Sequence, residues 1–256
     1  LRLVLTGYAQ QSDKHFSSYI ADDGSTEETR NLIKHIAKTS PVPIHHIWHE
    51  NHGFRKARIH NLTLQKIKEP YVIFTDGDCM PLPNMIATHR KLAHEKTMIS
   101  GSRVLLTQKW TSQLCMNQKY PKNSISSWLI HKIKGNINRL IPLIIPAHLS
   151  APHQKLSGIH GCHLSCYTKD LIHINGFDES FEGWGREDSD LVARLLHSGI
   201  QRRDMRGTPV LHLWHKENGR EHLENNNALL QACLNEKRQQ AIKGIHELPN
   251  KAVKNA

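Results

Sequence analysis

The clearest β-strand signal in this 256-residue sequence is Tyr71-Val72-Ile73-Phe74-Thr75-Asp76-Gly77-Asp78. Its first five residues are β-branched, aromatic or both, and a run of this kind is typical of a strand buried on both faces. The acidic turn that follows ends the strand. Strands buried on both faces occur mainly in parallel sheets covered by helices, so this stretch predicts an α/β fold.

Outward from this strand, predicted strands and helices alternate. Further strands are expected at residues 16–21, 44–48, 159–167 and 209–214, and helices at 1–8, 25–36, 56–68, 186–197 and 221–243. Ser25 and Glu28 have the spacing of a capping box, which predicts the start of the second helix. In parallel sheets ligands bind beyond the carboxyl ends of the strands, where the acidic turns at 22–23 and 76–78 lie.

The composition narrows the class of protein. Hydrophobic residues make up 38% and charged residues 22%, as in ordinary soluble domains, and the apolar stretch 140–149 is too short for a membrane-spanning helix. Lys and Arg outnumber Asp and Glu by 34 to 23, so an acidic partner is expected: phosphate groups, nucleic acid or an anionic membrane. Five scattered cysteines predict free thiols in a reducing compartment.

Residues 109–155 differ from the rest, because they are basic and show little regular alternation. One interpretation is an irregular, partly helical insertion with a solvated basic face. The other is a surface that rests on anionic lipid or accepts a charged polymer, with Trp128, Leu129, Ile130 and Ile133 as apolar contacts.

Two acidic segments could carry chemistry. Asp76 and Asp78 suit Mg²⁺ or Mn²⁺, although Asp and Gly are also ordinary turn formers. In the segment 183–190, Asp188 shares the inward helix face with residues 191, 192 and 195, whereas Asp190 precedes Arg194 by four and is expected in a solvated ion pair. Asp188 is therefore the candidate general base, with a pKa that burial raises.

Histidines offer further ligands. His212 or His215, after a short apolar strand, could complete a shell for Mn²⁺ together with the carboxylates. The tract His160–Cys166 looks like a zinc site, but neighbouring side chains along one strand point to opposite faces and no second Cys/His pair follows at zinc-finger spacing. We expect no zinc there.

Together these motifs resemble a known family. Ala21–Ser25, Asn51–Arg58 with Asn61, and Asp76–Asp78 are similar to the nucleotide-sugar half of family-2 glycosyltransferases with the GT-A fold. Asn175–Glu179 and Gly183–Asp188 resemble the acceptor half shared with β-1,4-galactosyltransferases and bacterial chondroitin-type polymerases. The resemblance runs from Leu1 to Arg220.

The resemblance implies a Rossmann-like GT-A domain with a mostly parallel sheet. Residues 1–108 would form the nucleotide-sugar half, 109–155 the basic insertion, 156–220 the acceptor-binding and catalytic half, and 221–256 a helical tail. It also implies roles for individual side chains, which fall into four groups. Donor contacts would come from Asp22 or Asp23, Arg55, Lys56, Arg58 and Asp76; metal ligands from Asp76, Asp78 and His212 or His215; acceptor contacts from Trp184, Gly185 and Glu187; and general-base catalysis from Asp188 beside Glu187.

The implied reaction is inverting transfer of a sugar from a UDP-type donor to a glycan hydroxyl of a surface polysaccharide or lipopolysaccharide, with Mn²⁺ or Mg²⁺. The expected location is the cytoplasm, with peripheral contact at the inner face of the cytoplasmic membrane left open. Two alternatives remain: a non-catalytic relative that binds glycan or nucleotide, and a basic nucleic-acid-binding protein. The second leaves the acids at the ligand edge unexplained, so no nucleic-acid partner is expected.

Two departures from the family pattern stand out. The sequence starts inside the first helix, so the family's first strand is absent and its neighbour would have an unprotected edge. His163 stands where such enzymes often have Asn. The whole interpretation requires that the acids at 76–78 and at 188 meet in one cleft.

Overall fold

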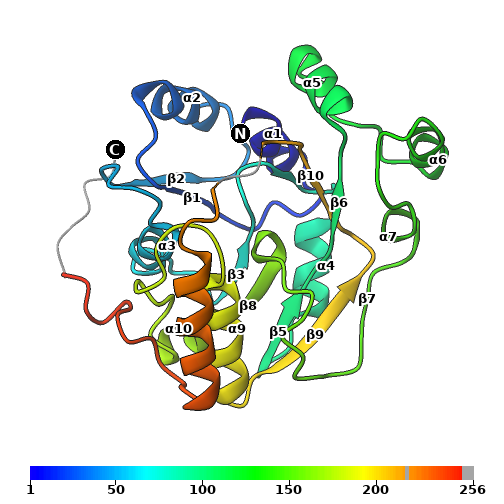
Figure 1. Ribbon diagram of the computed structural model, residues 1–256. Helices are drawn as coiled ribbons and strands as arrows, with labels where there is room; N and C mark the ends of the chain where they lie inside the picture. The colour runs from blue at the N-terminus through cyan, green and yellow to red at the C-terminus, as the bar shows by residue number, and fades with distance from the viewer. Residues whose placement is uncertain (217–218, 250–256) are drawn as a thin grey trace.

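The computed structural model describes residues 1–216 and 219–249. Helices and strands alternate strictly up to residue 74 (Figure 1). In chain order the elements are α1 (Arg2–Ala9), β1 (Ser18–Asp22), α2 (Glu27–Ala37), β2 (Ile44–Trp48), α3 (Lys56–Leu64), β3 (Tyr71–Phe74), β4 (Cys79–Met80), α4 (Met85–Leu92), β5 (Thr97–Ser100) and β6 (Arg103–Leu105).

The second half begins with a helical segment and then returns to the sheets. Its elements are α5 (Gln108–Asn117), α6 (Ile125–Ile133), α7 (Ile141–Ile144), β7 (His148–Leu149), the 3₁₀ turn η1 (Gly161–His163), β8 (Leu164–Tyr167), α8 (Thr168–His173), α9 (Glu187–His197), β9 (Gln201–Arg206), β10 (Val210–His212) and α10 (Leu223–Asn235). In Figure 1, α5, α6 and α7 lie along one side of the molecule, and α9 and α10 lie side by side at another. None of the helices described combines the length and the apolar composition needed to span a bilayer.

The strands form three sheets, ordered β1-β2, β4-β10-β6 and β3-β8-β5-β9-β7. Within the described residues, β1–β2, β10–β6 and β5–β9 pair in parallel, and the other four pairings are antiparallel. The α/β class is confirmed, but the sheets are mixed rather than mostly parallel. The reason is that β8 inserts between β3 and β5 in the opposite direction, while β4 and β7 run antiparallel to β10 and β9.

Three local predictions were wrong. The capping box is absent, because α2 has Thr26 at its N-cap and the Ser25 amide instead donates to Oδ1 of Asp22 at 2.8 Å. The strand expected at 159–167 begins only at Leu164, after the 3₁₀ turn. The C-terminal helix ends at Asn235, and the part of the predicted tail at 250–256 lies outside the described residues.

The two largest apolar clusters each combine residues from the first and the second half of the chain. In one, Leu191, Val192 and Leu195 of α9 pack against Val72 and Phe74 of β3, as the helical spacing of these apolar residues requires. In the other, residues of α1 pack with β4, β6 and β10 and with two buried tryptophans, Trp110 of α5 and Trp128 of α6. The two tryptophans therefore anchor the basic insertion to the rest of the fold through the apolar core.

Candidate active site

A cavity of about 1460 Å³ lies where the two halves of the chain meet. Its walls include residues of β1 and β3, the turn at 76–78, the segment 184–189 and the histidines that follow β10. Residues 18–21 of β1 pair with β2 along one edge and line the cavity as well. The other edge of β1 has no strand partner among the described residues, as sequence analysis expected, and it faces the cavity.

The register of β10 against β4 places a histidine beside the acidic turn. His212 is paired with Cys79, and the amide of Leu213 donates to the carbonyl oxygen of Asp78 at 3.0 Å. Nε2 of His212 and of His215 consequently lie 3.9 and 3.1 Å from Oδ2 of Asp78. The sheet therefore brings together Asp78 and two histidines that are far apart in the sequence, as sequence analysis expected.

The hydrogen bonds of the two histidines define which ring nitrogen is available to a cation. Nδ1 of His212 and Nδ1 of His215 each lie 2.9 Å from a backbone carbonyl oxygen. Because a carbonyl can only accept, Nδ1 carries the proton in each neutral ring and Nε2 keeps its lone pair. Both lone pairs face the Asp78 carboxylate, an arrangement that a divalent cation would satisfy. The donor set of carboxylate and imidazole fits a divalent transition-metal ion such as Mn²⁺.

Lys56, at the start of α3, joins the two halves of the cavity. Its Nζ lies 3.7 Å from Oδ1 of Asp76, 3.2 Å from Oε1 of Glu187 and 3.3 Å from Oδ2 of Asp188. Burial disfavours the charge of Lys56, but the three carboxylates outweigh it and hold its pKa well above the ordinary value. The acids at 76 and 188 therefore meet in one cleft, as the sequence interpretation required.

Asp188 has the environment of a general base. Burial raises its pKa to about 6; Glu187 and Asp76 act in the same direction, and Lys56 opposes them. A carboxyl group with this pKa is ionised at neutral pH and can still accept a proton readily. The carboxylate packs against Gly161, where an added Cβ would lie 1.7 Å from Oδ2 of Asp188. The 3₁₀ turn thus fixes the position of the carboxylate.

The predicted acceptor residues line the same cavity next to Asp188. Oε1 of Glu187 contacts Lys56, whereas Oε2 is buried and has no hydrogen-bond partner among the described residues. Trp184 is 44% exposed, and the guanidinium of Arg220 lies 5.5 Å from its ring centroid. Gly185, with φ of 109°, turns the chain between Trp184 and α9.

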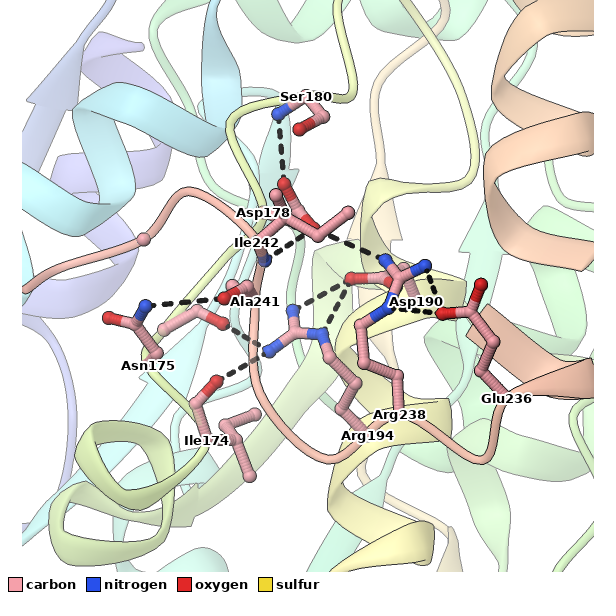
Figure 2. Close-up of polar contacts among 12 residues, drawn as sticks. Ile174, Asn175, Asp178, Ser180, Asp190, Arg194, Glu236, Arg238, Ala241 and Ile242 are labelled. Atoms are coloured by element: carbon pink, nitrogen blue, oxygen red, sulfur yellow. Dashed lines mark hydrogen bonds and ion pairs between the residues drawn. The ribbon is translucent and has the colours of Figure 1, made fainter. Parts of the chain in front are cut away.

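Behind the site, α9 is anchored by an ion pair that Figure 2 shows. Arg194 contacts Asp190 at 2.7 Å, and both side chains are fully buried. The spacing predicted this pair, but the expectation that it is solvated was wrong. Burial is tolerated because Nη1 of Arg194 also donates to the carbonyl oxygens of Ile174 and Gly176, at 2.8 and 2.7 Å. These bonds fix the helix, and with it Glu187 and Asp188 at its start.

The C-terminal segment reinforces this anchor. Asp178 accepts hydrogen bonds from the amides of Ser180 and Ile242, at 3.0 and 2.9 Å, and Arg238 lies 3.8 Å from the same carboxylate (Figure 2). The chain after α10 is thereby held against the turn that precedes the acceptor residues. The sequence signal Asn175–Glu179 is explained by this structural role.

In the turn after β1, the structure distinguishes Asp22 from Asp23, which sequence analysis left as alternatives. Asp22 is buried and accepts from His46 and the Ser25 amide, both at 2.8 Å. Burial opposes its ionisation, but these hydrogen bonds outweigh it and lower its pKa. Asp23 instead lines the cavity, where its carboxylate contacts His49 at 2.5 Å. Asp23 is therefore the one of the two acids that lines the cavity, where one of its oxygens contacts His49 and the other accepts from the Arg55 amide. Asp22 stabilises the turn.

The arginines predicted on the donor side point elsewhere. Arg55 donates through Nη2 to the carbonyl oxygen of Glu50 at 2.5 Å, and Arg58 contacts Glu179 at 2.9 Å. Since Glu179 also accepts from Asn61 of the same helix, Arg58 connects α3 to the acceptor half. The donor-side role expected for Arg55 and Arg58 is not supported by this geometry, and of the three basic residues Lys56 alone lines the cavity.

Comparison with known proteins agrees with both halves of this site. The family model described as glycosyl transferase family 2 matches residues 1–136, and the model described as the N-terminal domain of galactosyltransferase matches residues 143–216. The first match covers more than half of the chain.

The chain belongs to glycosyl transferase family 2. Validoxylamine A glucosyltransferase from Streptomyces hygroscopicus is 24% identical over 196 residues, which are 72% of this chain and 45% of that protein. Chondroitin synthase from Pasteurella multocida is 22% identical over 218 residues, 79% of this chain and 22% of that protein. Human chondroitin sulfate N-acetylgalactosaminyltransferase 1 is 42% identical over 60 residues, 22% of this chain and 11% of that protein. This family-2 chain thus spans less than half of the length of each of these relatives.

Solved structures place the family-2 chain in the GT-A fold. S. aureus TarS in complex with UDP matches with a TM-score of 0.58 and 12% identity, over 95% of this chain and 62% of the TarS chain. Mannosyltransferase PcManGT from Pyrobaculum calidifontis, in complex with GDP-Man and Mn²⁺, matches with a TM-score of 0.55 and 16% identity, over 90% of this chain and 58% of that one. At these identities the likeness concerns the fold.

Sequence reasoning missed two features of the family-2 site. Gly161 was noted only as the neighbour of His163, although its missing side chain is what admits the Asp188 carboxylate. Lys56 was assigned to the donor alone, whereas it contacts acids of both halves. Neither feature has a local signal, because each depends on residues that are distant in the sequence.

Proposed function

We propose that this chain transfers a sugar from a UDP-type nucleotide donor to a hydroxyl group of a glycan, with inversion at the anomeric carbon and with Mn²⁺ or Mg²⁺. The observation that carries the proposal is the ammonium of Lys56, which contacts Asp76 and Asp188 in one cavity. The proposed donor site and the proposed general base therefore adjoin the same ammonium group. We assign residues 1–108 to the donor half and 156–220 to the acceptor half.

On the donor side, Asp23 binds the nucleoside, and Lys56 compensates the charge of the diphosphate. Asp76, Asp78, His212 and His215 would hold a divalent cation, which would supply positive charge beside the leaving diphosphate. The facing lone pairs of His215 and Asp78 support this assignment. The TarS complex with UDP and the PcManGT complex with GDP-Man and Mn²⁺ support the ligand classes by analogy.

Asp188 acts as the general base. Its carboxylate accepts the proton of the acceptor hydroxyl while that oxygen attacks the anomeric carbon from the face opposite the nucleotide. The bond between the anomeric carbon and the diphosphate oxygen breaks, and the nucleoside diphosphate leaves with the bonding electrons. A single displacement inverts the configuration. Lys56 keeps Asp188 ionised at neutral pH, because its charge opposes the effect of burial on the pKa.

On the acceptor side, the unpaired Oε2 of Glu187 is positioned to accept a hydrogen bond from a sugar hydroxyl. The half-exposed ring of Trp184 provides an apolar wall for the face of a sugar, and Gly185 leaves room beside it. We infer that the acceptor is a polysaccharide or lipopolysaccharide of the cell surface, since the relatives include a bacterial chondroitin synthase. The five free cysteines favour a cytoplasmic location, where peripheral contact with the membrane would bring the site to such acceptors.

Thermal unfolding with nucleotides tests the proposal without knowledge of the acceptor. With Mn²⁺, UDP at about 100 times its Kd is expected to raise Tm by roughly 5–10 °C, and without Mn²⁺ the shift is expected to be much smaller. Asp78→Asn is expected to abolish the Mn²⁺-dependent part, and Glu28→Gln on α2 serves as the matched control. NMR of the product then gives the anomeric configuration. Absence of any nucleotide-dependent shift, or retention at the anomeric carbon, would overturn the proposal.

A further inference from the structure

The positive charge of the chain is concentrated in one segment. Residues 96–169 contain ten Lys and Arg residues and not a single Asp or Glu. The segment therefore carries +10 of the net charge of +11 and leaves +1 for the rest of the chain. Random placement of charge on a soluble surface does not explain such a separation, and a basic block of this kind is typical of a surface that meets an anionic partner.

Within this segment, helix α6 presents apolar side chains to solvent. Ile125, Leu129, Ile130 and Ile133 are 60%, 43%, 50% and 85% exposed, and their spacing places them on one face of the helix. The opposite face carries Trp128, which is 1% exposed. A surface helix normally directs its apolar face inward and its polar face outward, so α6 is apolar on both faces.

The burial of Trp128 corrects one part of the sequence interpretation. Trp128 was expected among the exposed apolar contacts, but it packs in the core against Trp110, with ring centroids 6.5 Å apart. His131 stacks on Trp110 at 4.0 Å and turns toward the same side. The aliphatic residues of α6 have no such partners in the described chain, and they form the outer surface.

The neighbouring helix extends this surface. Ile141 and Ile144 of α7 are 66% and 37% exposed, and α7 packs against α6 on the side of the molecule seen in Figure 1. We call the six residues Ile125, Leu129, Ile130, Ile133, Ile141 and Ile144 the α6–α7 surface. Apolar residues gathered in this way on one side of a monomer mark a contact site.

Basic side chains accompany the apolar residues of the α6–α7 surface along the sequence. Exposed lysines and an arginine precede those residues or lie between them: Lys119, Lys122, Lys132, Lys134 and Arg139. In residues 1–216 and 219–249, no ion pair involves any of the five. Their charge is therefore available to a partner.

We propose that the α6–α7 surface docks on a bilayer containing anionic lipid. Its isoleucines and leucine enter the region between the head groups, and its lysines contact the lipid phosphates. The combination excludes simpler partners: nucleic acid would use the charges and leave the aliphatic side chains in water. A second copy of the chain would cover the aliphatic residues but would bring like charges together on a symmetric interface.

The surface is separate from the candidate active site. As far as the described residues show, the walls of the cavity include none of residues 107–158. The membrane contact can therefore be tested without an activity assay, and it stands or falls independently of the proposed sugar transfer.

Vesicle flotation of the full chain tests the docking. We expect binding to vesicles with about 30 mol% phosphatidylglycerol, little binding to pure phosphatidylcholine, and weakening as salt rises from about 0.1 to 0.5 M. Ile130→Ser with Ile133→Ser is expected to weaken binding at least about tenfold at both salt concentrations. Lys132→Gln with Lys134→Gln is expected to weaken it about tenfold or more at low salt only.

Matched controls come from other exposed positions. Ile242→Ser, at a side chain that is 58% exposed, controls for the loss of an apolar group. Lys34→Gln on α2 with Lys38→Gln just after it controls for the loss of two charges. Unchanged Tm values establish that the variants fold. The proposal is overturned if the chain does not bind the vesicles, or if the control variants weaken binding as much as the test variants do. It is also overturned if heparin or duplex DNA binds the chain as tightly as the vesicles do and the isoleucine substitutions leave that binding unchanged. It is also overturned if the chain is a dimer in solution and Ile130→Ser with Ile133→Ser converts it to a monomer.

Discussion

Replacing Gly161 by alanine is expected to disable the site while the protein stays folded. The new Cβ would lie 1.7 Å from Oδ2 of Asp188, and ordinary contact begins at 3.4 Å. The carboxylate oxygen therefore has to move by about 1.7 Å, a displacement large enough to change its 3.3 Å contact with Lys56. Because a misplacement of about 1 Å can cost ~10²-fold in rate, we expect turnover to fall at least about a hundredfold.

The fold itself should tolerate this change. Gly161 lies in a 3₁₀ turn and is not one of the glycines with positive φ, so alanine causes no backbone strain. The side chain of Asp188 is 21% exposed and can rotate into the cavity. We therefore expect a shift in Tm of less than about 2 °C, which corresponds to less than about 1 kcal/mol.

The assay is the release of UDP at saturating donor and Mn²⁺, combined with the UDP-dependent shift in Tm. Gly219→Ala is the matched control, because an added Cβ there meets its nearest atom at an ordinary 3.5 Å. Gly161→Ala should reduce turnover and leave the UDP-dependent shift intact. Full turnover in a folded Gly161→Ala protein would show that the position of the Asp188 carboxylate does not matter, and the reasoning would fail.

Further predictions concern charge and pH. Lys56→Met removes the cation that lowers the pKa of Asp188, so the acid limb of the pH–rate profile should move upward from about pH 6. The control Lys68→Met should leave this limb in place. An unchanged limb in Lys56→Met would contradict the role of Lys56. His215→Ala should raise the Mn²⁺ concentration needed for half-maximal stabilisation by UDP at least about tenfold, and an unchanged requirement would remove His215 from the metal site. Burial lowers the pKa of His163 to about 4, so the unfolded chain binds more protons between pH 4 and 6.5 and stability is lost as pH falls through that window. From about pH 7.5 to 5.0 this loss is about 2 kcal/mol, and His163→Asn should reduce it in urea unfolding; equal losses in both proteins would refute the assignment.

The order of the elements could be predicted because it depends on local patterns. The strand at 71–74 follows from its continuous apolar run, and the helix at 187–197 from the spacing of Leu191, Val192 and Leu195. The direction of each strand does not follow from such runs, since it depends on which strand lies beside it. Insertion of β8 between β3 and β5 is a long-range event with no signature in any single segment.

The candidate site was predictable to the same extent. Acids at the ends of strands and at the start of a helix could be named from the sequence, because the fold directs those ends into one cleft. The partners of the charged residues could not be named. Arg58 contacts Glu179 and Arg194 is buried with Asp190 because of contacts that only the folded chain creates.

The central claim is that Asp188 is the base in a cleft that also binds the metal-bound nucleotide. Asp188→Asn keeps the shape of the side chain and removes its ability to accept a proton, so it tests this claim most directly. The account predicts that the rate of UDP release falls by ~10²–10⁴-fold while the Mn²⁺-dependent rise in Tm with UDP is preserved. Near-normal release of UDP by Asp188→Asn would contradict it.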